Sequence, residues 1–347
     1  MLNRIVSLRC CLVFLSSFLL WKSAIANRIS DNVDLLVFNR NTATVEKLSN
    51  ITGNFAKNGC TPGENWTLIV HGWREGTASE WVPPMFRLFQ KYRGGCVMMM
   101  VYANNDITVD YFGELTPVFE LLTATLLSYL KFIEASGFDA NDGLLFGFSF
   151  GAQMSFEAGR RFGIQKLGRI DACEPARPGF DDNSAFSGKD PKMAAKMVQC
   201  IHTSNSLGTV LRNCHVDWNM GNCGKDQPAA GPYPKGSHGL CPHFYNSAFE
   251  RSFVPVKKPS DCESSRPVLE WPVGLRMGYF CNISETGVLS LPNGITGDLF
   301  SPTAKAYPYN DETALKAECE KMKTNSWKDL LLYQPGYYES VNKMCSV

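Results

Sequence analysis

Residues 144–151 read LLFGFSFG and place Ser149 between two glycines in the pattern Gly-x-Ser-x-Gly. In enzymes that use this pattern, the serine stands on a sharp turn between a strand and a helix. There its hydroxyl can attack the carbonyl carbon of an ester. The alternative is a buried serine at the end of a glycine-rich strand, because so short a pattern also arises by chance. The flanking sequence must decide between the two.

The sequence around Ser149 favours the nucleophile. GLLFGF (143–148) predicts a buried strand and AQMSFEAGRRFG (152–163) predicts a helix that stops at Gly163. Gly147 and Gly151 have no side chains, and so tight a turn leaves no room for side chains at these positions. The helix that follows points its free amides at the position where negative charge develops during acyl transfer.

A serine nucleophile needs a base and a carboxylate that orients the base. On the sheet of an α/β-hydrolase these follow in the order Ser, Asp, His. Asp171 in GRIDACEP ends the next expected strand, 22 residues after Ser149, and is the predicted acid. The alternative is that Asp171 caps the turn after its strand. Five histidines are candidate bases: His71, His202, His215, His238 and His243.

Short apolar runs alternate with longer helical patterns along the chain. This alternation predicts an α/β fold with a mostly parallel central sheet and helices on both faces. The further expected elements are strands at 67–73, 96–103, 166–172 and 197–203 and a helix at 115–137.

The ends of the chain differ in character from its middle. Residues 1–26 have a basic start, an apolar run and a small-x-small cleavage site at Ala24–Ala26, which predicts a signal peptide and a secreted, extracellular protein. An uncleaved membrane anchor is the alternative. Residues 27–302 form the expected main domain. Residues 303–347 form a short C-terminal tail bounded by Cys319 and Cys345.

The composition agrees with secretion and excludes some functions. Eleven of the 13 cysteines follow residue 26, a density that suits disulfide bonds in an oxidising compartment, and their odd number leaves one unpaired. Glycosylation sequons begin at Asn50, Asn65 and Asn282, although Asn65 opens an apolar strand, which disfavours its use. The formal net charge of +1 gives no basic patch for nucleic acid, and no second long apolar run predicts a transmembrane anchor.

Several motifs in one order resemble the pancreatic lipase family, in particular its secreted insect branch of neutral lipases and phospholipases. They cover about residues 35–300. The resemblance implies an α/β-hydrolase fold and hydrolysis of lipid esters. The blocks are TLIVHGW, GFSFGA, RIDACEPARPGF, VQCIHTSNSLGT with CHVDWNMGNCGKDQP, GLCPHFYNSAFERSF, and RMGYF.

Carried over residue by residue, the resemblance implies a catalytic triad of Ser149, Asp171 and His243. His243 has the family's Cys-x-His placement, and His238, five residues earlier, is the alternative base. The backbone N–H groups of Trp73 and Phe150 would form the oxyanion hole. The second also follows from the elbow itself. The same resemblance gives His71, His202 and His215 structural roles.

The resemblance also implies a lid. Cys223 and Cys241 bracket a loop of 17 residues where the family has a disulfide-closed lid, although the family's usual first cysteine is shifted. The loop is rich in glycine and proline and cannot form a long helix, so the site should be open, as in phospholipases that cleave the sn-1 ester. The alternative is a closed surface loop without a role at the substrate. Other plausible disulfides are Cys60–Cys96, Cys200–Cys214, Cys262–Cys281 and Cys319–Cys345, with Cys173 left over.

The sequence departs from the family in ways that bear on function. Phe148 and Phe150 flank Ser149 where relatives carry other residues, and the segment SGKDPKMAAK lacks the family's full calcium-binding set, so no metal and no cofactor are expected. We therefore expect a secreted lipase-type serine esterase that contacts a lipid interface transiently and acts on acylglycerols or phospholipids. The alternative is an inactive lipid- or hormone-binding relative of the yolk-protein type, because fold alone does not fix function.

Overall fold

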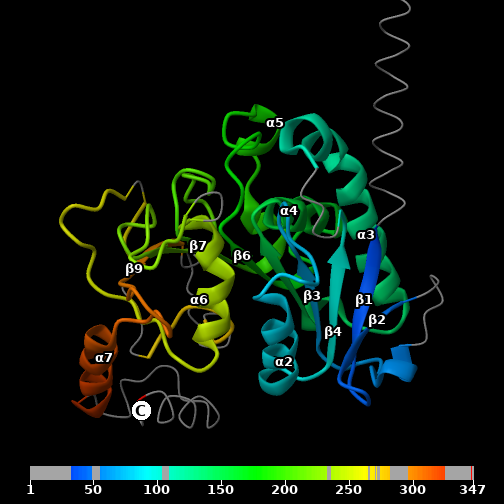
Figure 1. Ribbon diagram of the computed structural model, residues 1–347, viewed down its shortest axis with the longest axis horizontal. Coiled ribbons are helices and arrows are strands. Elements are labelled where there is room, and N and C mark those ends of the chain that lie inside the picture. Colours follow the sequence, from blue (N-terminus) through cyan, green and yellow to red (C-terminus); the bar gives the residue numbers. More distant parts are fainter. Residues whose placement is uncertain are drawn as a thin grey trace, which may run out of the picture.

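The computed structural model describes residues 33–48, 55–103, 109–232, 236–264, 266–269, 271, 274–281, 296–324 and 345. Strands and longer helices alternate through most of this part, as Figure 1 shows. The strands are β1 Asp34–Asn39, β2 Thr44–Lys47, β3 Trp66–Val70, β4 Cys96–Val101, β5 Gly143–Phe148, β6 Leu167–Cys173, β7 Ala195–His202, β8 Val216–Met220 and β9 Gly297–Ser301. The α-helices are α2 Val82–Tyr92, α3 Phe119–Ala135, α4 Phe150–Phe162, α5 Ser184–Ser187, α6 Cys241–Ala248 and α7 Glu312–Thr324.

The strands form one sheet in the order β2-β1-β4-β3-β5-β6-β7-β8-β9. From β4 to β9 every neighbouring pair is parallel, and β1 pairs with both β2 and β4 in the antiparallel sense. The predicted α/β-hydrolase fold with a mostly parallel sheet is therefore confirmed. Its carboxyl-terminal edge, where β3, β5, β6 and β7 end side by side, is where such folds place their active sites.

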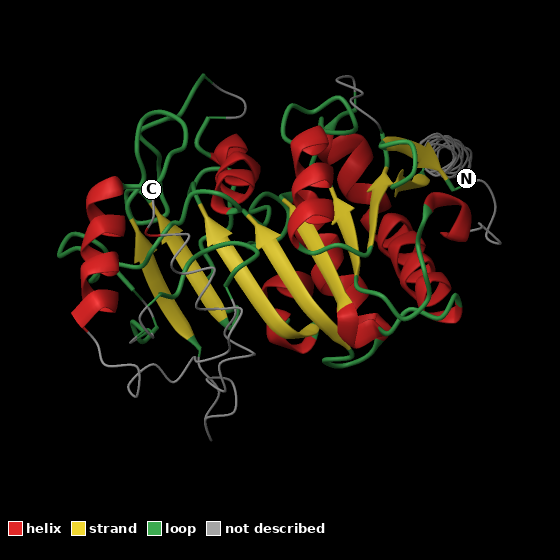
Figure 2. Ribbon diagram, turned by 90° about the horizontal axis from the view of Figure 1, so that it is seen from below, coloured by secondary structure: helices red, strands yellow, loops and turns green. Residues whose placement is uncertain are grey.

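Helices cover both faces of the sheet (Figure 2), and the strand sequences show why. Central parallel strands buried on both sides read as continuous apolar runs, as CVMMMV in β4 does. Alternate residues of β4 point to opposite faces: Met98 and Met100 pack in the core with α3 and α4, whereas Val97 and Met99 pack in the core with α2 and α6.

The predicted elements around Ser149 agree with the structure to within a few residues. β3, β4, β5, β6 and β7 overlap the five predicted strands, and α3 and α4 overlap the two predicted helices. The structure adds elements that the sequence patterns did not predict: the antiparallel edge strands β1 and β2, the outer strands β8 and β9, and the helices α2 and α6. Helix α7 lies within the expected C-terminal tail.

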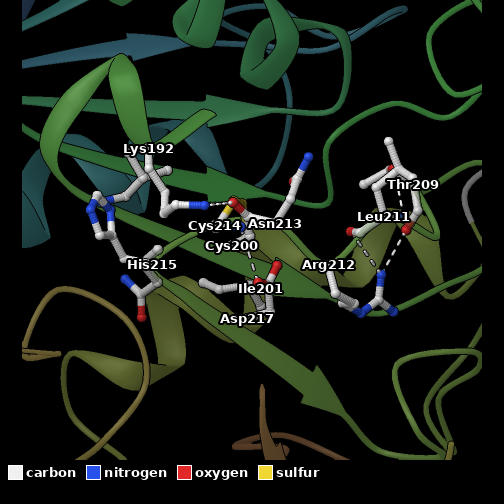
Figure 3. Close-up of a disulfide and its surroundings, with 12 residues drawn as sticks. Lys192, Cys200, Ile201, Thr209, Leu211, Arg212, Asn213, Cys214, His215 and Asp217 are labelled. Carbon is white, nitrogen blue, oxygen red and sulfur yellow. Dashed lines mark hydrogen bonds between the residues drawn. A yellow bond between two sulfur atoms is a disulfide. The ribbon is translucent and has the colours of Figure 1, made fainter. Parts of the chain in front are cut away.

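Five disulfides lie among the described residues, and three of them confirm predicted pairs: Cys60–Cys96, Cys200–Cys214 and Cys319–Cys345. Figure 3 shows the second, which joins β7 to the segment before β8. Beside it, Lys192 donates to the carbonyl of Asn213, and the amide of Cys214 donates to Asp217.

The remaining predicted pairs are wrong. Cys223 bonds to Cys262, and Cys241 bonds to Cys173, so neither the predicted Cys223–Cys241 nor Cys262–Cys281 forms. Cys173 is not left over. The free cysteine of the described part is Cys281, which is buried. The Cys173–Cys241 pair was not predicted because β6 and the start of α6 are far apart in the sequence, although they are adjacent in the fold.

The proposed signal peptide, residues 1–26, lies outside the described residues, as do Asn50 and Asn282. The domain boundary proposed at residue 302 remains a prediction. Across the described part of the chain, no helix is both long enough and apolar enough to cross a membrane.

Two glycines make the turn at Ser149 possible. A Cβ atom on Gly147 would lie 2.6 Å from the Cα atom of Ala152. A Cβ atom on Gly151 would lie 2.3 Å from the carbonyl oxygen of Val70 and 2.4 Å from that of His71. Helix α4 thus begins in direct backbone contact with the end of β3, and neither contact leaves room for a side chain.

The substitution Gly151→Ala is therefore expected to destabilise the fold by at least ~1–3 kcal/mol, because the added methyl group meets backbone atoms that cannot rotate away. Urea unfolding measures this as a lower midpoint at an unchanged slope. Gly231→Ala is the matched control, since a Cβ atom there meets nothing within 4 Å. Equal midpoints for the two variants would contradict the expected packing.

Candidate active site

Ser149 has the strained backbone of a nucleophile elbow. Its φ is 55° and its ψ is −118°, an unusual conformation for a residue with a side chain, and it lies between β5 and α4. The residue before the predicted oxyanion donor Trp73 lies against it, because a Cβ atom on Gly72 would be 3.0 Å from Ser149 Cβ. The strand–turn–helix setting inferred from the sequence is present.

The imidazole at Ser149 belongs to His238. Its Nε2 atom lies 2.9 Å from Ser149 Oγ, in the short helical turn His238–Leu240 just before α6. The predicted base, His243, is on α6. Its side chain lines a cleft of about 440 Å³ together with Trp81 and Tyr307. The structure thus brings the alternative histidine to the nucleophile in place of His243.

The two histidines lie on either side of the start of α6. His238 precedes the helix and reaches Ser149, whereas His243 lies within the first turn of α6 and lines the cleft instead. The sequence signal was the position of His238 at the end of a glycine- and proline-rich segment, which allows the chain to reach the sheet edge before the helix begins.

His238 is held in an apolar setting. Its ring packs on that of Phe148 with centroids 5.2 Å apart, and Phe148 packs in turn on Trp81. Burial lowers the pKa of His238 to about 3. When Nε2 accepts the hydroxyl proton of Ser149, Nδ1 carries the other ring proton, and within the described residues it has no hydrogen-bond acceptor.

Ser149 and His238 are both buried, with 6% and 8% of their surfaces exposed. The short loop before α6 had predicted an open site. The site is covered because that loop delivers His238 itself onto Ser149, where it packs on Phe148.

Asp171, the predicted acid, does not face His238. Its carboxylate is fully buried and accepts hydrogen bonds from Arg169 at 2.7 Å, Gln199 at 2.8 Å and Tyr245 at 2.5 Å. Arg169 in turn donates to the carbonyls of Gly278 and Tyr279. Asp171 and Arg169 thus form a buried ion pair, and the hydrogen bonds of Arg169 connect the middle of β6 to the segment 274–281.

The carboxylate at the edge of the sheet is that of Glu174, which the sequence analysis missed. Glu174 follows β6 directly, has a φ of 49° and is fully buried. Its carboxylate accepts hydrogen bonds from the amide and hydroxyl of Thr203 and from the amide of Ser204 at 2.9 Å. Burial raises the pKa of Glu174 to about 8, against the opposite influence of these donors.

Strand register could have found Glu174. In the parallel pair β5–β6, Asp171 stands opposite Phe146 and Cys173 stands opposite Phe148. The residue level with Ser149 is therefore the one after Cys173, which is Glu174. Asp171 lies three residues too early, inside the sheet.

A chain of hydrogen bonds joins the surroundings of Glu174 to those of His238. The side chain of Gln227 donates to the carbonyl of Thr203 at 2.9 Å, and the amide of Gln227 donates to the hydroxyl of Ser237 at 2.9 Å. Thr203 bonds to Glu174, and Ser237 directly precedes His238.

The two predicted oxyanion donors lie on the two segments that meet at Ser149. Phe150 opens α4, where the first amides of a helix have no acceptor within the helix. The indole of Trp73 donates to the carbonyl of Val109 at 2.8 Å, which fixes the loop after β3. Their role in stabilising an oxyanion stays a prediction.

The other histidines support loops. His71 accepts the amide of Tyr102 at 3.1 Å and stacks on its ring, while His202 bonds Asp217 at 2.8 Å. His215 accepts the amide of Val198 at 3.0 Å. These contacts agree with the structural roles that the family resemblance implied.

The sequence model of a known family matches residues 22–234, which is well over half of the chain, and its description is Lipase. The chain belongs to the lipase family. The match includes Ser149 and Glu174 and ends before His238. The resemblance to the pancreatic lipase family that the motifs indicated is thereby confirmed.

Among individual relatives of this lipase-family chain, phospholipase A1 of Vespula vulgaris is 44% identical over 92 residues, 26% of this chain and 27% of that protein. Human pancreatic lipase-related protein 2 is 28% identical over 169 residues, 46% of this chain and 35% of that protein. The chain thus spans about a third or less of the length of these relatives. A putative dienelactone hydrolase from Klebsiella pneumoniae aligns with 43% of this chain and 65% of its own, at 16% identity and a TM-score of 0.34.

Burial of the imidazoles predicts acid sensitivity of the fold. It lowers the pKa of His71, His202 and His215 to about 4 and that of His238 to about 3. The unfolded chain binds these protons near pH 6.5, so the free energy of unfolding should fall as pH is lowered from about 6.5 to about 4. Glu174 acts in the opposite sense, since its raised pKa favours the folded state at low pH, but it is one group against four.

Urea midpoints at pH 7, 5.5 and 4.5 test this expectation and should decrease in that order. A midpoint that stays constant from pH 7 to pH 4.5 would show that the imidazoles do not control acid stability.

Proposed function

We propose that this protein is a secreted serine carboxylic-ester hydrolase that acts on lipid esters, namely acylglycerols or the sn-1 ester of phospholipids. The observation that carries the proposal is the 2.9 Å contact between Ser149 Oγ and His238 Nε2 at a strained strand–helix turn. Membership of the lipase family and the similarity to a wasp phospholipase A1 and a human pancreatic lipase-related protein support lipid esters as the substrate class.

In the proposed reaction, Ser149 Oγ attacks the ester carbonyl carbon while its proton passes to His238 Nε2. The C–O bond to the alcohol then breaks, and His238 returns the proton to the departing alcohol, leaving an acyl group on Ser149. A water molecule attacks this acyl-enzyme and gives its proton to His238. The C–O bond between the acyl group and Ser149 then breaks, His238 returns the proton to Ser149 Oγ, and the fatty acid leaves. The low pKa of His238 keeps its imidazole neutral, and able to accept a proton, throughout the neutral range.

The oxyanion of each tetrahedral intermediate would accept hydrogen bonds from the amides of Phe150 and Trp73. The amide of Phe150 opens α4, so the positive end of the helix dipole adds to it.

Glu174 is the carboxylate that we propose to support the imidazolium formed on His238. It stands level with Ser149 at the sheet edge and is linked to Ser237 through Thr203 and Gln227. Catalytic hydrogen bonds are often incomplete before substrate binds, which fits an Nδ1 atom that has no acceptor within the described residues. We do not assign this role to Asp171, because its carboxylate is paired with Arg169.

Secretion rests on the leader-like sequence of residues 1–26 and on the five disulfides of the described residues. An oxidising compartment is where such bonds form and persist.

The proposal predicts that the secreted protein hydrolyses a short-chain ester, a triglyceride or a phospholipid and is labelled on Ser149 by a serine-directed phosphonate. Ser149→Ala should abolish both turnover and labelling. His238→Asn should reduce kcat/KM by at least about 10³-fold through loss of the base, whereas His243→Asn, on the same segment but in the α2–α6 cleft, should stay within about threefold.

Absence of turnover and of labelling in the intact, folded protein would overturn the enzyme proposal in favour of the inactive lipid-binding alternative. A larger loss with His243→Asn than with His238→Asn would restore the base first inferred from the sequence.

Above about pH 8, where Glu174 is ionised, Glu174→Gln is expected to lower kcat by about 10²–10⁴-fold with a smaller change in KM, because the imidazolium loses its counter-charge. In the parent protein, kcat/KM should rise as pH increases through about 8, where Glu174 ionises, and this rise should vanish in Glu174→Gln. Asp171→Asn is the matched control and should lower stability instead, since it breaks the buried pair with Arg169. A Glu174→Gln variant with parental kcat and pH profile would remove Glu174 from the mechanism.

A further inference from the structure

We propose that the Cys173–Cys241 disulfide is the positioning element that holds the imidazole of His238 against Ser149. The inference rests on the proposed function, and it assigns to this bond a role in the reaction beyond general stability. It follows from what each cysteine touches and from how few hydrogen bonds hold His238.

On one side, Cys173 is part of the nucleophile's own scaffold. It ends β6 and stands opposite Phe148 in the parallel pair with β5. The amide of Ser149 donates to the carbonyl of Cys173 at 3.0 Å, and the amide of Ala176 donates to the carbonyl of Ser149 at 3.2 Å. The chain around Cys173 therefore holds both backbone polar groups of Ser149.

On the other side, Cys241 is rigidly joined to His238. The turn His238–Leu240 runs directly into α6, which Cys241 opens, so only two residues, Gly239 and Leu240, separate His238 from Cys241. The disulfide brings the Cα atoms of Cys173 and Cys241 to 5.7 Å. One covalent bridge and one helical turn thus connect the backbone of the nucleophile to the base.

Few hydrogen bonds hold the ring in place. Within the described residues, its Nδ1 atom has no hydrogen-bond partner, and the printed sequence before it, QPAAGPYPKGS, is rich in proline and small residues. Residues 228–232 are exposed or half-buried. The backbone amide of Gln227 donates a hydrogen bond to the hydroxyl of Ser237 at 2.9 Å, one residue before His238. Beyond the hydrogen bond to Ser149, the ring packs on that of Phe148, an apolar contact that has no fixed direction.

A base that can slide loses rate steeply, because a displacement of about 1 Å in a catalytic group can cost about 10²-fold. Both cysteines of the bond are fully buried, and its loop closes 68 residues, so it also restricts the unfolded chain. Its removal must therefore be compared with that of another buried disulfide. Cys60–Cys96 serves for this comparison because it joins the start of β4 to a loop at the opposite end of the strands.

The test compares the double variants C173A/C241A and C60A/C96A in the full chain. Both should lose stability. Only C173A/C241A should lose kcat, by about 10–100-fold with KM within about twofold, and only in it should phosphonate labelling of Ser149 slow by a similar factor. Parental kcat in folded C173A/C241A, or an equal loss in C60A/C96A, would overturn the inference.

A second measurement keeps the test decisive if C173A/C241A does not fold. The intact protein is partly reduced with a phosphine, its free thiols are alkylated, and it is then exposed briefly to the phosphonate. Peptide mapping should find alkylated Cys173 depleted among molecules labelled on Ser149, and equal alkylation in labelled and unlabelled molecules would overturn the inference. Failure of the intact protein to react with phosphonate at all would instead refute the proposed function.

Discussion

The direct contact between the start of α4 and the end of β3 is the constraint on which the site depends. Gly151 sits against the carbonyl oxygens of Val70 and His71, so the chain must turn within one residue of β5. That residue is Ser149, and it takes a φ of 55° as a consequence. The same contact brings the loop after β3 beside the first amides of α4. The backbone geometry of Ser149 thus follows from how closely a helix packs on a strand.

Much of this could be read from the sequence, and the errors have a common cause. Ser149 was found because its signal is local: an apolar strand, two glycines and a helix follow one another in the chain. The acid and the base are defined by what lies across the sheet from Ser149, which no local pattern states. Asp171 was chosen as the acidic residue of the expected strand, but the register places it level with Phe146, inside the sheet.

The choice between His238 and His243 also could not be made from local sequence. His238 and His243 differ by little in sequence and by more than a helical turn in space, since one precedes α6 and the other lies within it. The pairing of Cys173 with Cys241 could likewise not be predicted. Strands β7 and β8 separate β6 from α6 along the chain, whereas β6 and α6 are in contact in the fold. Long-range packing, which decides all three cases, leaves no periodic trace in a single chain.

The phenylalanines beside Ser149 have separate consequences. Phe148 faces the α2 and α6 side of the sheet, where it meets Trp81 and His238 and makes the surroundings of the imidazole apolar. Phe150 faces the other side and packs among Tyr111, Phe119 and Phe180. Phe148 therefore contributes to the apolar surroundings of the His238 imidazole, while Phe150 anchors the first turn of α4 in an aromatic cluster.

The bridge from Cys173 to Cys241 also determines what a protease could do to this protein. The exposed residues 228–232 lie between the two cysteines, and between Cys223 and Cys262 as well. A single cut there would separate the chain that carries Ser149 from the chain that carries His238, yet two covalent bonds would still join the fragments. The nicked molecule would migrate as one species without a reductant and as two with it. Ser149 and His238 would remain parts of one molecule although no longer parts of one polypeptide.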